Sequence, residues 1–133
     1  MHITLESDYA VRIVEALASQ PVRVGAGVIA ELTGVTPRFT LKILHKLVSA
    51  GIVRSYKGAK GGYELARPAA EITLRDVIET VEGPYTFSRC LDPTHACKCE
   101  NTACRRGSCR FQQVYDDISD TVRKKLEQVT FAR

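Results

Sequence analysis

A helix start signal at Thr36-Pro37 is the feature that most constrains how this chain can fold. A threonine side chain can accept a hydrogen bond from the first turn of a helix, and proline suits the first helical position because it has no N–H to leave unpaired. Gly34 lies just before this signal, where glycine commonly ends a helix. The sequence therefore predicts a short helix over 28–32, a tight turn, and a longer helix over 37–50.

Two further helices are expected on either side of this pair. Apolar residues recur with helical spacing over 5–19, and Pro21 must end that first helix. Thr73 is a suitable N-cap, with Asp76 as the acid three residues later, and Gly83 ends the helix that they open.

A basic hairpin lies between these helices. The segments 52–56 and 63–65 have the composition of short strands, and the run 57–62 between them is rich in lysine and glycine. The order of helix, short helix, turn, helix and hairpin is typical of a winged helix-turn-helix, which reads DNA with its second motif helix. The expected fold class is mainly α, with a two-stranded β wing.

A long helix is expected at the C-terminal side of the chain, starting near Arg110. Its apolar residues form a seam at helical spacing: Val114, Ile118, Val122, Leu126 and Val129. We divide the chain into a DNA-binding domain over 1–84, a cysteine-rich loop over 85–109 and the long helix over 110–133.

The charge pattern favours a nucleic-acid partner. The net charge is only +4, but Lys and Arg dominate between Thr36 and Arg67, where Glu64 is the single acid. On a helical wheel, Phe39, Ile43, Leu44 and Leu47 face the core, and the opposite side is basic. The candidate DNA-binding residues are Thr36, Arg38, Leu41, Lys42, Lys57 and Lys60.

These candidates have different expected roles. Arg38 and Lys42 are expected to contact bases. Lys57 and Lys60 on the wing are expected to contact phosphate groups or the minor groove. Leu41 either touches a thymine methyl group or packs against a neighbouring helix. A basic helix face alone would indicate only solvent exposure, but here it occurs with the helix cap and the basic wing in the right order.

Five cysteines lie within one short stretch of the chain: Cys90, Cys97, Cys99, Cys104 and Cys109. An odd number without an export signal argues against a disulfide framework, so a metal or redox site is the leading interpretation. Thiolates suit both iron-sulfur clusters and zinc. Paired Cys-x2-Cys knuckles are absent, so zinc is less favoured than an iron-sulfur cluster. Unligated structural thiols are the remaining alternative.

The sequence resembles the Rrf-two family of IscR-type and NsrR-type regulators. The resemblance covers nearly the whole chain, and the wing signature followed by clustered cysteines is its most specific part. The matching motifs are Ser7-Asp8-Tyr9-Ala10-Val11-Arg12, Ala50-Gly51-Ile52, Gly58-x-x-Gly61-Gly62-Tyr63-x-Leu65 and Ile72-Thr73-Leu74-Arg75-Asp76-Val77-Ile78. The resemblance implies a dimeric transcription factor, in most members a repressor, whose DNA affinity is controlled by a bound cluster.

The resemblance also implies a ligand set. Family members have three cysteines, which Cys90, Cys104 and Cys109 match best, so three or four of the five cysteines are expected to hold a [2Fe–2S] or [4Fe–4S] cluster. Asp8 matches a position where some relatives donate a carboxylate to the cluster, although it could equally cap the first helix. His95 is a weaker candidate, and Gln112 stands where some relatives have a histidine ligand.

We therefore expect a transcriptional repressor that senses redox state, nitric oxide or iron-sulfur status, with the direction of the switch left open. Its expected partners are a second copy of the chain and double-stranded DNA with a palindromic operator. One alternative is a cluster-free thiol-redox or cysteine-metabolism repressor of the same fold, and another is a small iron-sulfur electron carrier. No enzyme is expected, because no nucleophile-base pair can be argued from spacing, and no long apolar run is present, which predicts a cytoplasmic protein without a membrane partner.

Overall fold

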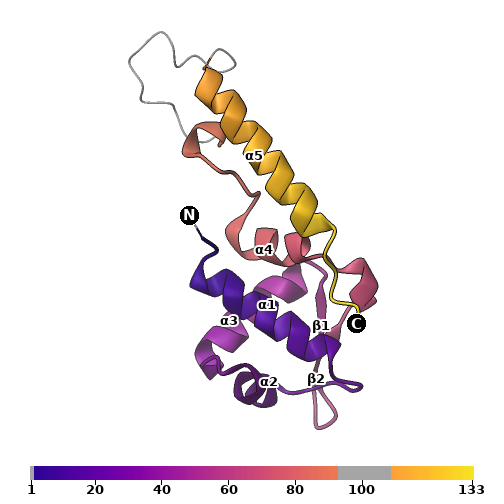
Figure 1. Ribbon diagram of the computed structural model, residues 1–133. Helices are drawn as coiled ribbons and strands as arrows, with labels where there is room; N and C mark the ends of the chain where they lie inside the picture. The colour runs from indigo at the N-terminus through magenta and orange to yellow at the C-terminus, as the bar shows by residue number, and fades with distance from the viewer. Residues whose placement is uncertain (1, 93–108) are drawn as a thin grey trace.

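The computed structural model describes residues 2–92 and 109–133, and it is mainly helical with one two-stranded antiparallel sheet (Figure 1). This confirms the predicted winged helix-turn-helix. The elements are α1 (Leu5–Ala18), α2 (Ala26–Thr33), α3 (Pro37–Ser49), β1 (Val53–Tyr56), β2 (Gly62–Leu65), the 3-10 helix η1 (Ala69–Glu71), α4 (Leu74–Glu82), the 3-10 helix η2 (Arg89–Leu91) and α5 (Arg110–Glu127).

The helix start signals in the sequence act as predicted. The Thr36 hydroxyl accepts a hydrogen bond from the Phe39 N–H at the start of α3. Thr73 and Asp76 form a reciprocal capping box at the start of α4, with N···O distances of 3.1 and 2.9 Å. Gly34 ends α2 in the left-handed conformation that glycine adopts without strain.

A buried apolar core joins α1, α2, α3, β1 and α4. Leu44 and its neighbours on one face of α3 are completely buried in it. Burying such a side chain stabilises the fold by about 1.5–3 kcal/mol relative to leaving it in water. The fully buried large side chains of this core include Ile13, Val14, Ile29, Ile43, Leu44, Leu47, Ile72 and Val77.

The predicted core face of α3 is wrong at one position. Phe39 is 44% exposed, and its ring packs edge-on against that of Tyr9. Thr40 takes the expected place in the core and is 0% exposed. The buried face is centred on Thr40, Ile43, Leu44 and Leu47, whose spacing of three and four residues defines one side of a helix.

The wing is an antiparallel hairpin that a third segment extends. Val53 pairs with Leu65 and Tyr56 with Gly62, and an additional β-bridge joins Val24 to Tyr63. Gly62 has a φ of 138°, and a Cβ atom on it would lie 2.8 Å from the Val24 carbonyl oxygen. Only glycine lets the two backbones approach this closely.

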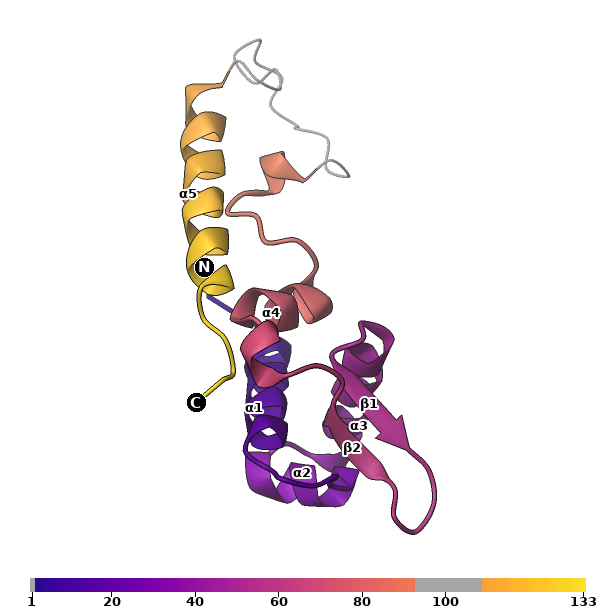
Figure 2. The ribbon, with the colours of Figure 1, turned by 90° about the vertical axis from the view of Figure 1, so that its right-hand side faces the viewer.

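Helix α5 projects from this compact body with its N-terminal end far away, and the chain that follows its C-terminal end continues alongside the body (Figures 1 and 2). The helix ends at Glu127, so Val129 lies outside the seam in which it was placed. Thr130 forms a β-bridge with Thr73, and Phe131 is only 7% exposed within the core. The segment predicted as one helix over 110–133 is therefore a helix followed by a docked tail.

Candidate functional site

The exposed side of α3 carries the residues that were predicted to contact DNA. Leu41 is 51% exposed, so its side chain is not packed in the core. An open groove of about 640 Å³ separates this side of α3 from the strands of the wing. It is lined by Leu41, Lys42, His45, Lys46, Val48, Ser55 and Tyr63.

An acidic residue from another helix lies beside the basic side of α3, and no local pattern of residues could have predicted it. The Glu6 carboxylate of α1 is 2.6 Å from the Lys46 ammonium and 4.0 Å from that of Lys42. The Lys42 ammonium also lies 5.8 Å from the centre of the Phe39 ring. These contacts hold the two lysines near α1 in the chain without DNA.

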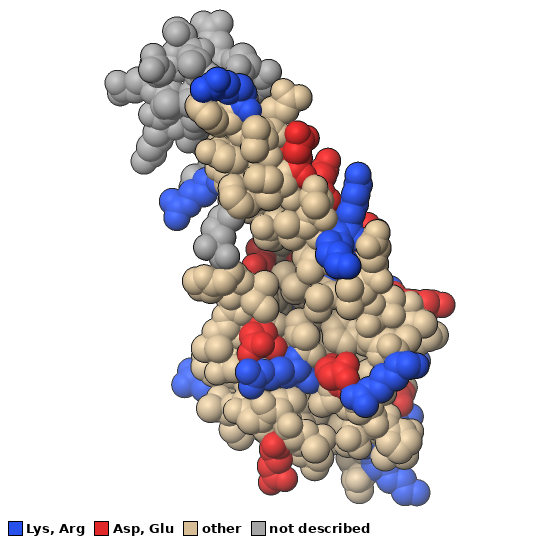
Figure 3. Space-filling view, viewed as in Figure 1, with Lys and Arg blue, Asp and Glu red and all other residues tan. Residues whose placement is uncertain are grey.

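The wing presents Lys57 and Lys60 on an exposed turn, as predicted. Arg23 packs against the strands beside this turn. Its guanidinium stacks 3.3 Å from the centre of the Tyr56 ring and lies 3.6 Å from a Glu64 carboxylate oxygen. On the face shown in Figure 3, acidic and basic side chains are interspersed over the compact body.

Two of the five cysteines lie in segments that meet at the N-terminal end of α5. Cys109 is the N-cap residue of α5, and Cys90 lies in η2; both are half-buried. The Gln112 side-chain amide donates a 3.1 Å hydrogen bond to the Cys90 carbonyl oxygen, which joins the two segments. The Cys90 thiol lies 3.3 Å from the Ser88 hydroxyl.

The remaining predicted cysteine ligands are not among the described residues. Cys97, Cys99, Cys104 and His95 lie outside the described residues. Within residues 2–92 and 109–133, no three His, Cys, Asp or Glu side chains are grouped as a metal site would require. The ligand set therefore stays a prediction.

Asp8 lies in the first turn of α1, and its carboxylate is 2.8 Å from the Arg12 guanidinium. Its expected alternative role as the helix cap is wrong, because Thr4 is the N-cap and accepts a hydrogen bond from the Ser7 N–H. Asp8 as a cluster ligand stays a prediction.

A buried serine connects the chain before Cys90 to the middle of α5. Ser119 is 0% exposed, and its hydroxyl accepts a 2.8 Å hydrogen bond from the Phe87 N–H and donates to the Tyr115 carbonyl oxygen. The rings of Phe87 and Tyr115 lie 5.5 Å apart between their centres. Sequence reasoning missed Ser119, because a serine in a polar helix gives no sign that it will be buried.

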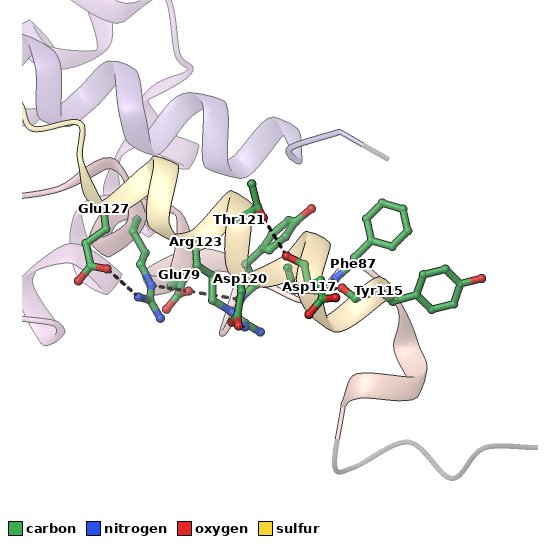
Figure 4. Close-up of polar contacts among 11 residues, drawn as sticks. Glu79, Phe87, Tyr115, Asp117, Asp120, Thr121, Arg123 and Glu127 are labelled. Carbon is green, nitrogen blue, oxygen red and sulfur yellow. Dashed lines mark hydrogen bonds and ion pairs between the residues drawn. The ribbon is translucent and has the colours of Figure 1, made fainter. Parts of the chain in front are cut away.

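An ion-pair network joins the other end of α5 to α4. The Arg75 guanidinium lies 3.0 Å from Glu79 on its own helix and 3.3 Å from Glu127 on α5 (Figure 4). The hydrogen bond that Arg75 donates to Glu79, together with the negative charges of Glu79 and Glu127, raises the pKa of Arg75 above its ordinary value.

No helix within the described residues combines the length and apolar character needed to span a membrane.

Comparisons with known proteins place this architecture in a family of regulators. Over 91 residues the chain is 38% identical to a Mycobacterium tuberculosis protein named as an HTH-type transcriptional regulator, a match that covers 67% of this chain and 56% of that protein. The chain thus spans little more than half the length of this relative.

Two solved structures share the fold over nearly the whole chain. IscR of T. potens superposes with a TM-score of 0.75 at 23% identity, covering 98% of this chain and 83% of the other. CymR, the global cysteine regulator of B. subtilis, superposes with a TM-score of 0.75 at 25% identity, covering 98% and 93%.

The family profile described as "Rrf2: Iron-dependent Transcriptional regulator" matches residues 3–133. That range includes the winged helix-turn-helix, the cysteine stretch and α5 with its docked tail. The chain therefore belongs to the Rrf2 family of transcriptional regulators.

Proposed function

We propose that the chain is a homodimeric, DNA-binding repressor whose cysteine stretch holds an iron-sulfur cluster that controls DNA affinity. The observation that carries this proposal is that the two ends of α5 contact different parts of the molecule. One end of the helix is docked on the winged helix-turn-helix, and the other end bears Cys109 and contacts the Cys90 segment. A change at the cysteines can therefore be passed along one rigid element to the DNA-reading body.

The reading side of the proposal rests on α3 and the wing. Arg38 and Lys42 are exposed near the start of α3, where residues of a recognition helix meet base edges in the major groove. Lys57 and Lys60 would hold phosphate from the wing. In a homodimer, two such helices would have to match half-sites about 34 Å apart on a palindromic operator.

The dimer is proposed to form along α5. Phe111 and Val114 are exposed on this helix, and Ile118, Val122 and Leu126 continue the apolar seam as half-buried residues. Pairing two such seams would bury apolar surface and fix the distance between the two reading helices.

The described cysteines fit the proposed cluster. Their thiols are half-buried, and Cys109 caps an 18-residue helix whose N-terminal end carries a partial positive charge that favours thiolate over thiol. Arg89 and Arg110 flank them in sequence and would offset the negative charge of a thiolate cage. When bound, the cluster would supply an inorganic group that reacts with oxidants and nitric oxide.

The cluster-free alternative is supported by the likeness to CymR. Staphylococcus aureus CymR, including its oxidized form, also shares the fold, with TM-scores of 0.71 and 0.72 at 27% identity. Under this alternative the same cysteines would switch through disulfides, and DNA affinity would respond to oxidation without iron.

Anaerobic purification with iron, sulfide and visible-absorption analysis separates these two mechanisms. The proposal expects a coloured, iron-containing protein that loses its colour in Cys90→Ala, Cys104→Ala and Cys109→Ala variants. A colourless, iron-poor protein whose DNA affinity still responds to oxidants would favour the cluster-free repressor. Salt-dependent binding to a palindromic promoter fragment separates either repressor from an electron carrier.

A further inference from the structure

A carboxylate at the end of α4 holds the start of α1. Glu82 accepts hydrogen bonds on the same oxygen from the Thr4 N–H at 2.8 Å, from the Thr4 hydroxyl at 2.7 Å and from the Ser7 hydroxyl. Thr4 is also the N-cap of α1, and Ser7 is completely buried. Glu82 thus fixes the first turn of α1 at its cap and at its buried side.

A second carboxylate connects this turn to α3, the proposed DNA-reading helix. Glu6 lies between Thr4 and Ser7, and it forms the short contact with the Lys46 ammonium and the longer one with that of Lys42. The Glu6 side chain is only 26% exposed, so solvent and salt screen the Lys46 pair less than a fully exposed one. Since both lysines line the groove between α3 and the wing, Glu6 neutralises charge that would otherwise meet phosphate.

The chain that follows Glu82 leads directly to the cysteine stretch. Gly83 has a φ of 80°, and Pro84 comes next, before the segment that Phe87 ties to Ser119. A displacement of the Cys90 segment would therefore act on the last residue of α4, which is Glu82 itself.

We propose that Glu82 and Glu6 are positioning residues for DNA binding, in which Glu82 holds the first turn of α1 so that Glu6 competes with DNA phosphate for Lys46. Releasing the turn frees Lys46, and in part Lys42, for the phosphate backbone. The inference rests on the proposed DNA-binding function and gives the cysteine stretch a route to the reading helix.

The test is the salt dependence of binding to a short mixed-sequence duplex, because the phosphate contribution does not depend on sequence. It compares the full chain with Glu6→Gln, Glu82→Gln and the double variant, and with Glu71→Gln as the control. The control makes the same change in net charge at an exposed position on η1. Circular dichroism establishes that each variant is folded.

Glu6→Gln is expected to bind about threefold more tightly than the control at low salt, and its plot of log K against log salt is expected to be steeper by about 0.9, the value of one additional phosphate contact. Glu82→Gln should change binding in the same direction. The double variant should bind no more tightly than Glu6→Gln alone, because Glu82 acts through Glu6. Ser7→Ala, which removes one donor to Glu82 and leaves both carboxylates, should reproduce part of the effect if Glu82→Gln does not fold.

The proposed role of Glu82 and Glu6 is overturned if Glu6→Gln binds no more tightly than Glu71→Gln. It is also overturned if Glu82→Gln changes affinity equally with and without Glu6, which a merely structural residue would do. A full chain with no salt-dependent duplex binding would instead refute the proposed DNA-binding function, and with it the proposed role of Glu82 and Glu6.

Discussion

The two ends of α5 are held in different ways. At the C-terminal end, the Leu74 N–H donates to the Val129 carbonyl oxygen at 2.8 Å, Thr130 pairs with Thr73, and Phe131 enters the core. At the N-terminal end, the contacts among the described residues include a few hydrogen bonds and one pair of rings, and Phe111 is more than half exposed.

This difference indicates which part of the molecule can respond to a signal. The DNA-reading body and the docked tail share one apolar core, so disturbing them costs the burial of several side chains. Among the described residues the cysteine end has little apolar packing, so a bound group or an oxidised thiol could change its arrangement at small cost. Under the proposed function, the reading body is a fixed platform and the cysteine end is the responsive part.

The largest expected effect comes from shortening a phenylalanine at each end of α5. Phe131→Ala removes a buried ring and should lower the free energy of unfolding by about 3–5 kcal/mol. Phe111→Ala removes an exposed ring and should lower it by less than about 1 kcal/mol. Urea unfolding at low protein concentration measures both. Equal losses would contradict the comparison, because the cysteine end would then be packed as firmly as the tail.

Ser119 tests what holds the cysteine end. Ser119→Ala leaves the part-buried Phe87 N–H without its acceptor, which costs up to about 1–3 kcal/mol and should open the chain around Phe87. Amide hydrogen exchange should rise in this segment and remain unchanged in α3. Thr121→Ala is the matched control, since Thr121 makes the same contact to the carbonyl four residues earlier but is exposed on α5. Faster exchange in both variants would show that Ser119 has no special role.

A smaller effect is expected inside the reading body. The Thr40 hydroxyl is buried, and no described residue gives it a hydrogen-bond partner. Thr40→Val removes this unpaired group and should raise the free energy of unfolding by about 1 kcal/mol. Thr33→Val should lower it, because the Thr33 hydroxyl donates to the Ile29 carbonyl oxygen at 2.7 Å. Thermal melts that show a loss in both variants would mean that the Thr40 hydroxyl is paired.

The smallest effect concerns pH. Partial burial acts to raise the pKa of Glu82, but hydrogen bonds from Ser7 and Thr4 outweigh it and hold the pKa below its ordinary value of 4.5. A carboxyl group with a lowered pKa in the folded state contributes stability above its unfolded pKa, and that contribution is lost as pH falls through the folded pKa. Glu82→Gln should therefore give a shallower loss of stability below about pH 4.5 than the full chain shows. Parallel acid unfolding curves would refute this role of Glu82.

Much of the reading body could be predicted from the sequence, because its signals are local. Thr36-Pro37, Gly34 and the Thr73 capping box each mark a helix end by the hydrogen bonds of a single turn. The error at Phe39 and Thr40 has a different origin. A helical wheel places each residue by its angle, and Thr40 lies inside the buried arc while Phe39 lies at its edge. Assigning the core face from apolarity favours phenylalanine over threonine.

The features that join the parts of the molecule could not be predicted, because they depend on tertiary contacts. Val129 fits a helical seam equally well in sequence, but its carbonyl oxygen accepts from the Leu74 N–H and Thr130 pairs with Thr73, so the tail after the helix is held by contacts with a distant part of the chain. The contacts of Glu82 with Thr4 and of Glu6 with Lys46 join residues far apart in the chain. The cysteine spacing indicated a metal site, and the structure adds that the Cys90 segment contacts α5 through Gln112, in the first turn after Cys109.

The most direct test of the account is the DNA affinity of anaerobically purified protein, measured on a palindromic promoter fragment before and after the cysteine-bound group is destroyed with nitric oxide. The account expects the affinity to change by at least about tenfold, which corresponds to about 1.4 kcal/mol, and expects Cys109→Ala to show no response. The same affinity before and after treatment, in a protein that contains iron and sulfide, would contradict the claim that the cysteine end of α5 controls the reading body.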